Sequence, residues 1–500
     1  ADIAIKDGKI EKIGFLGEPS AKAVIDATGQ YVAPGFIDIN NASDRHWALF
    51  NHPFSESLLY QGITTIIGGN CGSSLAPLTT GNIIATIQKW ADIKQINVNW
   101  LTISDFFAEV KRKKLLLNFG TLAGHATLRR GIVGDQFREL TEQELAQMKQ
   151  MFIEALAEGV LGFSTGLVYS HAKVADKNEI MALVSLLGPG KIYSSHLRDE
   201  EGKFYESVLE AIDTAKKNKT NIEISHLKSI GKENWSLFDK SLEAIEKAAE
   251  EGININFDIY PYTSTATVFY TILPDWIAIG GRMKLVENLK NQDLKKRVIE
   301  EMKGRENDFN DIIIASGNID KTFIGKTIGT ISKNQGIGIL ETVINLLIAA
   351  EGKLIVFWPS LSEENFIKAL KNPLSIIASD GAAYNLNDAR AGYLAHPRSF
   401  GCFPRILSRY VREKNIISLE EAVKKMTALP ALKIGLTYRG IIRQGFFADI
   451  IIFDPNTVKD LATFENPFQY AQGIHSVIIN GNIALSKSRI ISQTQGHILS

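Results

Sequence analysis

Hydrophobic and polar residues alternate in blocks along the chain between residues 35 and 380. Short apolar runs that end in polar or glycine-rich residues are separated by stretches with the periodicity of amphipathic helices. This alternation predicts parallel strands joined by crossover helices, an α/β fold. Because there are eight such runs, we expect a (β/α)8 barrel of the TIM type. The runs are GFIDIN, TTIIGGN, NFGTLAGH, VLGFSTG, IYSSHL, NIEISHL, ININFDIYP and LSIIASD.

The stretches between these runs include recognisable helix boundaries and two unusual segments. Thr141 and Glu144 form a T-x-x-E capping box before an amphipathic stretch that ends at Gly159. Residues 275–373 are too many for one crossover helix and predict an inserted helical lobe. The segment GAAYNLNDARAGYLAHPR follows the eighth run, where barrel loops carry the active site, and is a candidate lid.

Both ends of the chain have short alternating strands and turns instead of the βα pattern. We therefore expect residues 1–31 and 435–500 to pair in one small, discontinuous β-sandwich domain. Residues 32–434 would then form the barrel, with the lobe inserted at about 275–373.

Composition narrows the function classes. The hydrophobic share of 45% and charged share of 22% are ordinary for a globular protein, and Lys plus Arg equals Asp plus Glu at 55 each. This balance leaves no basic excess for a nucleic acid partner. No run of eighteen apolar residues occurs, and the first residues do not resemble a signal peptide. With only two cysteines, Cys71 and Cys402, these features favour a cytoplasmic protein without a membrane partner.

Four residues that can bind metal or transfer protons lie at the ends of predicted strands: Cys71, His196, His226 and Asp380. Taken singly, each has an ordinary structural alternative: a buried thiol, hydrogen-bonded imidazoles and a turn carboxylate. In a barrel, however, the carboxyl ends of the strands meet at one mouth. A thiolate, two imidazoles and a carboxylate brought together there predict a zinc site with a position left for water.

Motifs along essentially the whole chain resemble, in order, those of N-acyl-D-amino-acid deacylases (D-aminoacylases) in the amidohydrolase superfamily. The GNCG, SHLK and HPR segments distinguish this group from dihydroorotases and hydantoinases. The motifs are PGFIDINNASD, QGITTIIGGNCGSSLAPL, GHATLRRGIVG, GFSTGLVYS, SSHLRDEEG, ISHLK, FDIYPYTSTAT, LPDW, ASDG, HPRSFGCFPRIL and RGIIRQGFFADIIIFDP.

The resemblance implies roles for the strand-end residues. Cys71, His196 and His226 would hold one tightly bound Zn²⁺ ion, and Asp380 would act as general acid and base.

The resemblance also implies a substrate site. Arg398 and Lys228 would bind the α-carboxylate of an N-acyl amino acid, and Tyr169 and Tyr260 would line the substrate wall. A surface salt bridge is the structural alternative for Arg398. The D configuration of the substrate rests on the resemblance alone.

One motif departs from the superfamily. Most members end strand one with His-x-His for a second metal, but this chain has Asn40 and Ala42 there, which are poor or impossible zinc ligands. His46 and His52 lie at other offsets and are weak substitutes. Strand four, GFSTG, also lacks the lysine that relatives carbamylate to bridge two metals. We therefore expect a single zinc ion.

The predicted function is zinc-dependent hydrolysis of N-acyl-D-amino acids to a carboxylate and a free D-amino acid. Two alternatives stay open: a catalytically impaired binding protein of the same fold, and a hydrolase of cyclic amides. The residues determine neither the preferred side chain and acyl group nor the oligomeric state.

Overall fold

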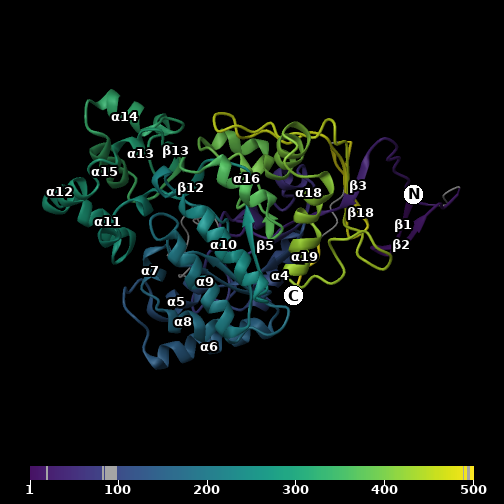
Figure 1. Cartoon of the computed structure of the whole chain (residues 1–500), viewed down its shortest axis with the longest axis horizontal. Helices are drawn as coiled ribbons and strands as arrows, with labels where there is room; N and C mark the ends of the chain where they lie inside the picture. Colours follow the sequence, from purple (N-terminus) through teal and green to yellow (C-terminus); the bar gives the residue numbers. More distant parts are fainter. Residues whose placement is uncertain (18–20, 82–83, 85–97, 488, 492–495) are drawn as a thin grey trace.

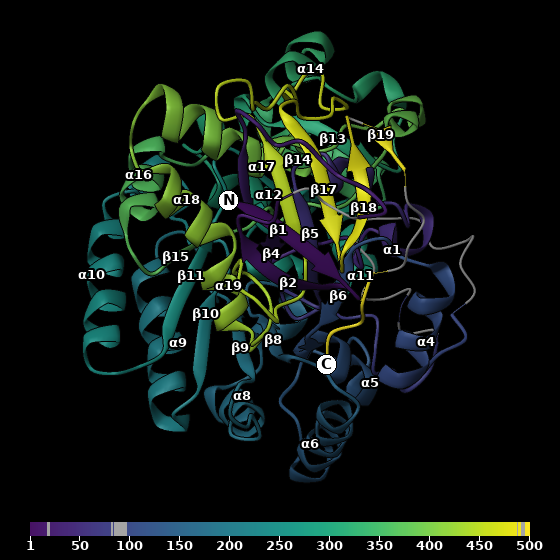
Figure 2. The same ribbon diagram turned by 90° about the vertical axis from the view of Figure 1, so that its right-hand side faces the viewer.

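A ring of short parallel strands forms the centre of the protein (Figures 1 and 2). The structure is a computed structural model, and it describes residues 1–17, 21–81, 84, 98–487, 489–491 and 496–500. Each of the eight predicted runs contains a strand of this ring, so the predicted α/β barrel pattern is confirmed. The strands are β4 (Phe36–Asp38), β5 (Ile63–Gly68), β6 (Asn118–Thr121), β7 (Ala123–Gly124), β8 (Gly162–Gly166), β9 (Ile192–His196), β10 (Asn221–Ile224), β11 (Ile255–Ile259) and β15 (Ser375–Ile377).

The strands follow one another around the ring in chain order. Ladders of parallel hydrogen bonds give the orders β4-β5-β6 and β7-β8-β9-β10-β11-β15, and only Leu122 separates β6 from β7. Beyond the last strand, Asp380 N donates to Asn40 O at 2.9 Å and Ala42 N donates to Gly381 O at 2.7 Å. These two bonds bring the segments after the first and eighth strands side by side.

Helices cover the outside of the ring. In α6 the predicted capping box is present, because the Thr141 hydroxyl accepts from Glu144 N and the Glu144 carboxylate accepts from Thr141 N. The longer helices of this layer are α4 (Ile103–Lys113), α5 (His125–Val133), α6 (Glu142–Ala157), α8 (Lys177–Val184), α9 (Phe204–Asn218), α10 (Leu237–Glu250), α16 (Glu363–Lys371), α17 (Arg398–Arg405), α18 (Leu419–Met426) and α19 (Ala428–Lys433). Single-turn helices are α1 (Ala48–Asn51), α2 (Glu56–Leu59) and α7 (Ser170–Lys173).

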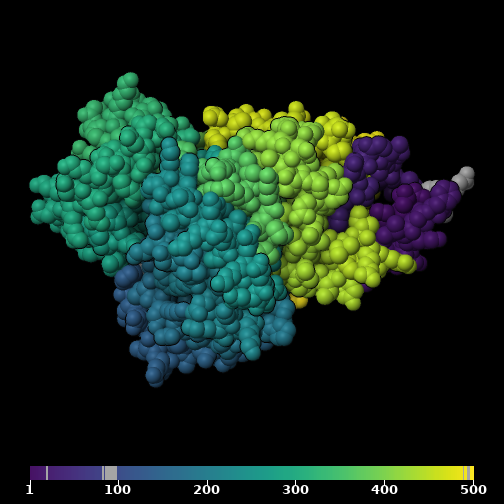
Figure 3. All heavy atoms as spheres, in the orientation of Figure 1, coloured from purple at the N-terminus to yellow at the C-terminus, as the bar shows by residue number. Residues whose placement is uncertain are grey.

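A lobe between β11 and β15 projects from one end of the molecule (Figures 1 and 3). It has its own apolar core, which includes Phe269, Leu289, Ile314 and Leu347. Its strands form an antiparallel sheet in the order β12-β14-β13. The elements are β12 (Thr265–Val268), β13 (Ile313–Gly317), β14 (Leu354–Trp358), α11 (Gly281–Lys290), α12 (Gln292–Glu301), α13 (Glu306–Asn310), α14 (Ile328–Gln335) and α15 (Ile339–Ala349).

The lobe differs from the predicted helical insertion at 275–373 in two respects. It contains a three-stranded sheet whose first strand, β12, begins ten residues earlier, at Thr265. At the other end of the predicted range, α16 packs against the barrel strands β11 and β15. This helix therefore belongs to the barrel layer and not to the lobe. The alternation in β12 is too short to separate it from the preceding barrel run in the sequence.

The two ends of the chain form a small pair of sheets beside the barrel, with the first strands and the last ones in contact (Figure 2). β1 and β2 form a hairpin, and β3 joins the C-terminal strands in the order β19-β18-β17-β16-β3. Ile10, Ala448, Ile450 and Ile478 form a core between these sheets. The strands are β1 (Asp2–Lys6), β2 (Lys9–Gly14), β3 (Tyr31–Pro34), β16 (Ile450–Phe453), β17 (Ile474–Ile479), β18 (Asn482–Ser486) and β19 (Arg489–Ile490).

In the part of the chain that the structure describes, no helix combines the length and the apolar character needed to cross a membrane.

A buried ion pair joins the small sheets to the barrel. Asp449, just before β16, pairs with Arg439 and also accepts hydrogen bonds from Asn118 Nδ2 at 3.1 Å and from Asn480 N at 2.8 Å. Asn118 belongs to β6, so this carboxylate bonds to both units. We expect Asp449→Ala to lower the free energy of unfolding by about 3–5 kcal/mol, because Arg439 would stay buried without a counter-charge. Thermal and urea unfolding measure the loss.

Asp454 supplies the control for this prediction. It follows the same strand, and among the described residues its carboxylate accepts local bonds from Asn456 N and the Thr457 hydroxyl. Asp454→Ala should therefore cost no more than about 1 kcal/mol. Equal losses in the two variants would show that the buried pair does not join the units.

Candidate metal and substrate site

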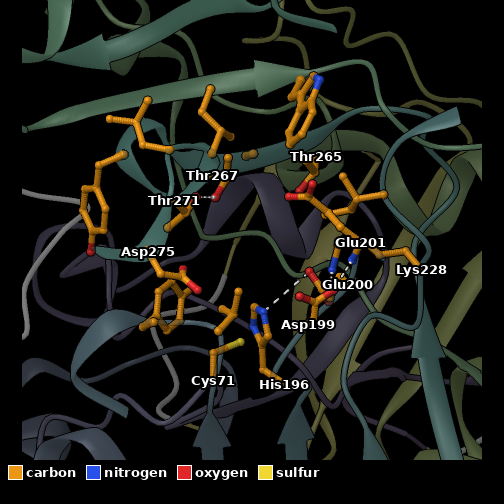
Figure 4. Close-up of a pocket in the computed structure, with 18 of the residues that line it drawn as sticks. Cys71, His196, Asp199, Glu200, Glu201, Lys228, Thr265, Thr267, Thr271 and Asp275 are labelled. Atoms are coloured by element: carbon orange, nitrogen blue, oxygen red, sulfur yellow. Dashed lines mark hydrogen bonds and ion pairs between the residues drawn. The ribbon is translucent and has the colours of Figure 1, made fainter. Parts of the chain in front are cut away.

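The carboxyl ends of the barrel strands open into a cavity of about 500 Å³. Cys71 and His196 lie on one side of it, and Thr267 and Thr271 of the lobe lie on the opposite side (Figure 4). The wall also includes the strand-end residues His226 and Asp380, Arg45 from the loop after β4, and Arg398 at the start of α17. The lobe contributes Thr265, Tyr270, Leu273, Met302 and Trp358 as well. The lobe therefore closes over the mouth of the barrel.

The structure brings together the three predicted metal ligands. The donor atoms of Cys71, His196 and His226 all lie within 4.8 Å of one another, and all three residues are buried. Within the described ranges, neither ring nitrogen of His196 has a hydrogen-bond partner. Buried imidazole nitrogens normally have hydrogen-bond partners, so the His196 ring fits the role of a metal ligand. A thiolate and two imidazoles are a donor set that suits zinc.

Strain marks the same positions. Cys71, His226 and Asp380 have φ values of 54°, 38° and 46°, in the left-handed region that residues with a Cβ rarely adopt. Such strain persists only where the surrounding structure enforces it, and it is concentrated at functional sites. Three of the four predicted strand-end residues thus share an unusual backbone conformation.

Glycines allow the Cys71 loop to reach this position. A Cβ on Gly72 would lie 2.7 Å from Gly166 N, and a Cβ on Gly166 would lie 2.2 Å from Cys71 O. The GNCG segment and the end of GFSTG are therefore pressed together backbone to backbone. Because no side chain fits at Gly166, that end of strand four cannot carry a lysine.

Electrostatics favour the thiolate of Cys71. Burial raises the pKa of this thiol, but the guanidinium of Arg45 and the His226 ring outweigh burial and hold the pKa well below its ordinary value. An anionic sulfur is the form that binds a metal. Cys402, by contrast, is buried and free and donates to Ala378 O at 3.2 Å, and burial raises its pKa.

Glu200 is a residue that the sequence analysis missed. Its carboxylate accepts a hydrogen bond from Lys228 Nζ at 2.6 Å and lies 3.3 Å from His226 Nδ1 and 3.6 Å from His196 Nε2. Burial raises the pKa of Glu200, but Lys228 and His196 lower it well below its ordinary value. Glu200 thus contacts both candidate imidazole ligands. Its spacing of four residues from His196 in SSHLRDEEG was the available signal.

Lys228 lines the cavity, but its ammonium is already engaged. Besides Glu200, it contacts His226 Nδ1 at 2.8 Å and donates to His226 O at 3.2 Å. Glu200 and His226 O thus take two of the three N–H donors of this lysine. The predicted contact of Lys228 with a substrate carboxylate stays a prediction.

Asp380 lies between two arginines. Its Oδ2 is 2.9 Å from an Arg398 guanidinium nitrogen, and its Oδ1 is 3.5 Å from one of Arg45. Burial raises the pKa of Asp380, but Arg398, His226 and Arg45 outweigh it and keep the carboxyl ionised. Arg398 is therefore buried in the site and not part of a surface salt bridge. The sequence analysis did not single out Arg45.

The two predicted wall tyrosines differ in position. Tyr169 lines the cavity, with its ring centroid 5.4 Å from that of His196. Tyr260 lines a smaller neighbouring cavity, and its ring centroid lies 4.8 Å from the guanidinium carbon of Arg398. Tyr260 thus contacts the arginine that was predicted to bind the substrate.

At the end of strand one, the residues near the expected His-x-His positions have other partners. Asn40 Nδ2 donates to Asp258 at 3.1 Å, and the methyl side chain of Ala42 has no atom that can bind a metal. His46 Nδ1 lies 3.0 Å from the Tyr384 hydroxyl, and burial and the neighbouring arginines lower the pKa of His46 to about 3. His52 pairs with Asp388 at 3.4 Å in the predicted lid segment, which contains a short 3₁₀ helix, η5 (Leu386–Ala391).

Comparison with known proteins agrees with this geometry. Residues 372–485 match a model described as the amidohydrolase family. An N-acyl-D-aspartate deacylase of Alcaligenes xylosoxydans xylosoxydans is 31% identical over 100% of this chain and 91% of its own length. A D-aminoacylase of the same organism is 30% identical over 100% of this chain and 93% of its own. The chain belongs to the N-acyl-D-amino-acid deacylase family.

Solved structures of this family superpose on the whole chain. An N-acyl-D-glutamate deacylase from Bordetella bronchiseptica, in complex with zinc and a phosphonate that mimics the tetrahedral intermediate, has a TM-score of 0.83 at 28% identity and covers 99% of this chain and 94% of its own. A D-aminoacylase described by a binuclear metal centre, with one-metal activation and second-metal attenuation, has a TM-score of 0.81 at 29% identity, with coverage of 99% and 95%.

More distant matches show the fold alone. An L-hydantoinase from Arthrobacter aurescens has a TM-score of 0.56 at 16% identity and covers 98% of this chain and 93% of its own. The α/β barrel with a small β domain is thus shared beyond the deacylases. As a member of the deacylase family, the chain is a hydrolase that acts on amide bonds.

The buried Glu200–Lys228 pair leads to a stability prediction. We expect Glu200→Gln to lower the free energy of unfolding by about 3 kcal/mol, because the ammonium of Lys228 would lose its buried counter-charge. Glu201→Gln is the matched control, since Glu201 pairs with Arg305 at 3.2 Å and both side chains are about one-third exposed. That variant should lose less than about 1 kcal/mol. Urea unfolding of both variants tests the difference, and equal losses would contradict it.

Proposed function

We propose that this protein hydrolyses the amide bond of N-acyl-D-amino acids, releasing a carboxylate and a free D-amino acid, with one zinc ion. The names of its relatives, an N-acyl-D-aspartate deacylase and a D-aminoacylase, support this substrate class. The observation that carries the proposal is the convergence of Cys71, His196 and His226 beside the ion pair of Asp380 and Arg398.

Cys71, His196 and His226 would hold the ion. His196, whose ring nitrogens have no hydrogen-bond partner among the described residues, fits this role, and Glu200 would orient His226 through Nδ1. When bound, zinc polarises the amide carbonyl and lowers the pKa of a water molecule to about 7. The bound zinc of the similar N-acyl-D-glutamate deacylase supports the choice of metal.

Asp380 would accept the proton of the attacking water and deliver it to the nitrogen of the leaving amine. Its carboxylate is ionised, which a base requires, but its contacts with Arg398 and Arg45 make it a weak one. An anionic substrate that pairs with Arg398 would draw this guanidinium away from Asp380. The pKa of Asp380 would then rise, so the carboxyl would become a stronger base when substrate is present.

Arg398 would bind the α-carboxylate of the substrate. It is buried and lies over the ring of Tyr260, and its Nε has no hydrogen-bond partner in the described part of the chain. A guanidinium has the planar geometry to hold a carboxylate with two parallel hydrogen bonds. The predicted help from Lys228 would come from an ammonium that already donates to Glu200 and to His226 O.

The role of Asp380 can be separated from metal binding. We expect Asp380→Asn to lower kcat/KM for N-acetyl-D-amino acids by about 10³-fold, since an amide cannot take up the proton. One zinc per chain should remain, as determined by elemental analysis. Asp388→Asn, a change in the lid segment away from the ligands, should keep most activity. Zinc retention without turnover of any acyl substrate by the unmodified protein would instead support the binding-protein alternative.

The role of Arg398 can be tested with matched substrates. The unmodified enzyme should prefer an N-acetyl-D-amino acid over its α-carboxamide by about 100-fold in kcat/KM, because only the acid forms the charge-assisted pair. Arg398→Ala should remove this preference. Comparing the two substrates within each variant cancels any effect of the substitution on Asp380. Equal turnover of acid and amide by the unmodified enzyme would favour the cyclic-amide alternative.

A further inference from the structure

Arg45 is a buried cation at the mouth of the barrel that the proposed mechanism does not require. Its side chain is 8% exposed and lines the same cavity as Cys71 and Asp380. One guanidinium nitrogen lies 3.5 Å from Asp380 Oδ1, and Nε has no hydrogen-bond partner among the described residues. A buried, incompletely bonded arginine is costly unless nearby negative charge stabilises it. Asp380 and the Cys71 thiolate supply that charge.

The backbone holds Arg45 in place. Asp44 accepts a hydrogen bond from Arg45 N at 2.7 Å through one carboxylate oxygen and from Gly69 N at 2.6 Å through the other. Gly69 lies two residues before Cys71, so the loop that carries Arg45 is tied to the loop that carries the thiolate. The position of the Arg45 loop at the mouth of the barrel is therefore fixed by the hydrogen bonds of these backbone N–H groups to Asp44.

We propose that the guanidinium of Arg45 takes the place of a second metal ion beside Asp380. Asn40 and Ala42 cannot bind a metal firmly, and Arg45 follows them on the same segment. A divalent ion next to Asp380 would be repelled by this fixed positive charge. Arg45 is thus a positioning residue: it supplies positive charge to Asp380 at any metal concentration.

This inference rests on the proposed zinc site and differs from the binuclear centre, with second-metal attenuation, described for the similar D-aminoacylase. It implies that the chain binds one zinc ion even when zinc is in excess. It also implies that restoring ligands on strand one is not sufficient to create a second site. The positive charge must be removed as well.

Metal counting on three proteins tests the inference. The unmodified chain and the Asn40→His/Ala42→His variant should each bind one zinc per chain, and the Asn40→His/Ala42→His/Arg45→Asn variant should bind two. Calorimetric titration with zinc alone should show a second ion bound at least about 100-fold more tightly in the triple variant than in the double variant. A second ion bound equally well by both, or by neither, would overturn the inference.

A second measurement uses the unmodified protein, in case the variants do not fold. Crystals soaked in excess zinc should show one anomalous peak, at Cys71, His196 and His226, with Arg45 in contact with Asp380. Two peaks, with Arg45 displaced, would overturn the role of Arg45 and leave the proposed hydrolysis intact. No peak at all would overturn both, because the ligand set itself would have failed.

Discussion

Two backbone hydrogen bonds join the segment after β15 to the segment after β4, from Asp380 N to Asn40 O and from Ala42 N to Gly381 O. They fix the first and last barrel segments side by side at the end where all the strands finish. The general acid/base candidate thereby comes next to the loop of Arg45. The left-handed conformation of Asp380 is part of the same junction. These two bonds therefore fix the position of Asp380 relative to the loop that carries Arg45.

Around that junction, the site is a network of buried charges that balance one another. Asp380 faces Arg398 and Arg45, and Glu200 faces Lys228. Buried charges are tolerated only when they are paired, so each member holds its partner in place. In the proposed mechanism, an anionic substrate would compete with Asp380 for Arg398. The lobe lines the far side of the cavity, and the paired side chains are buried, which strengthens their attraction.

The sequence was most informative where local pattern and chemistry coincide. The eight strands, the capping box of α6 and the meeting of Cys71, His196 and His226 were all predictable, because strand ends in a parallel barrel share one edge. The sheet of the lobe was not, because β12 follows the seventh barrel strand with little to mark a boundary. Glu200 and Arg45 were not singled out either, since both lie in loops beyond the strand ends.

By itself, the sequence determined the fold class, the family and the set of metal-binding residue types, because these depend on periodicity and on motifs whose order survives divergence. It also determined that strand one lacks its histidines. Only the tertiary structure decided which partner each charged residue has. Electrostatic partners such as Arg45 and Asp380 are 335 residues apart in the chain, and no local pattern encodes which ion pairs form when distant loops meet.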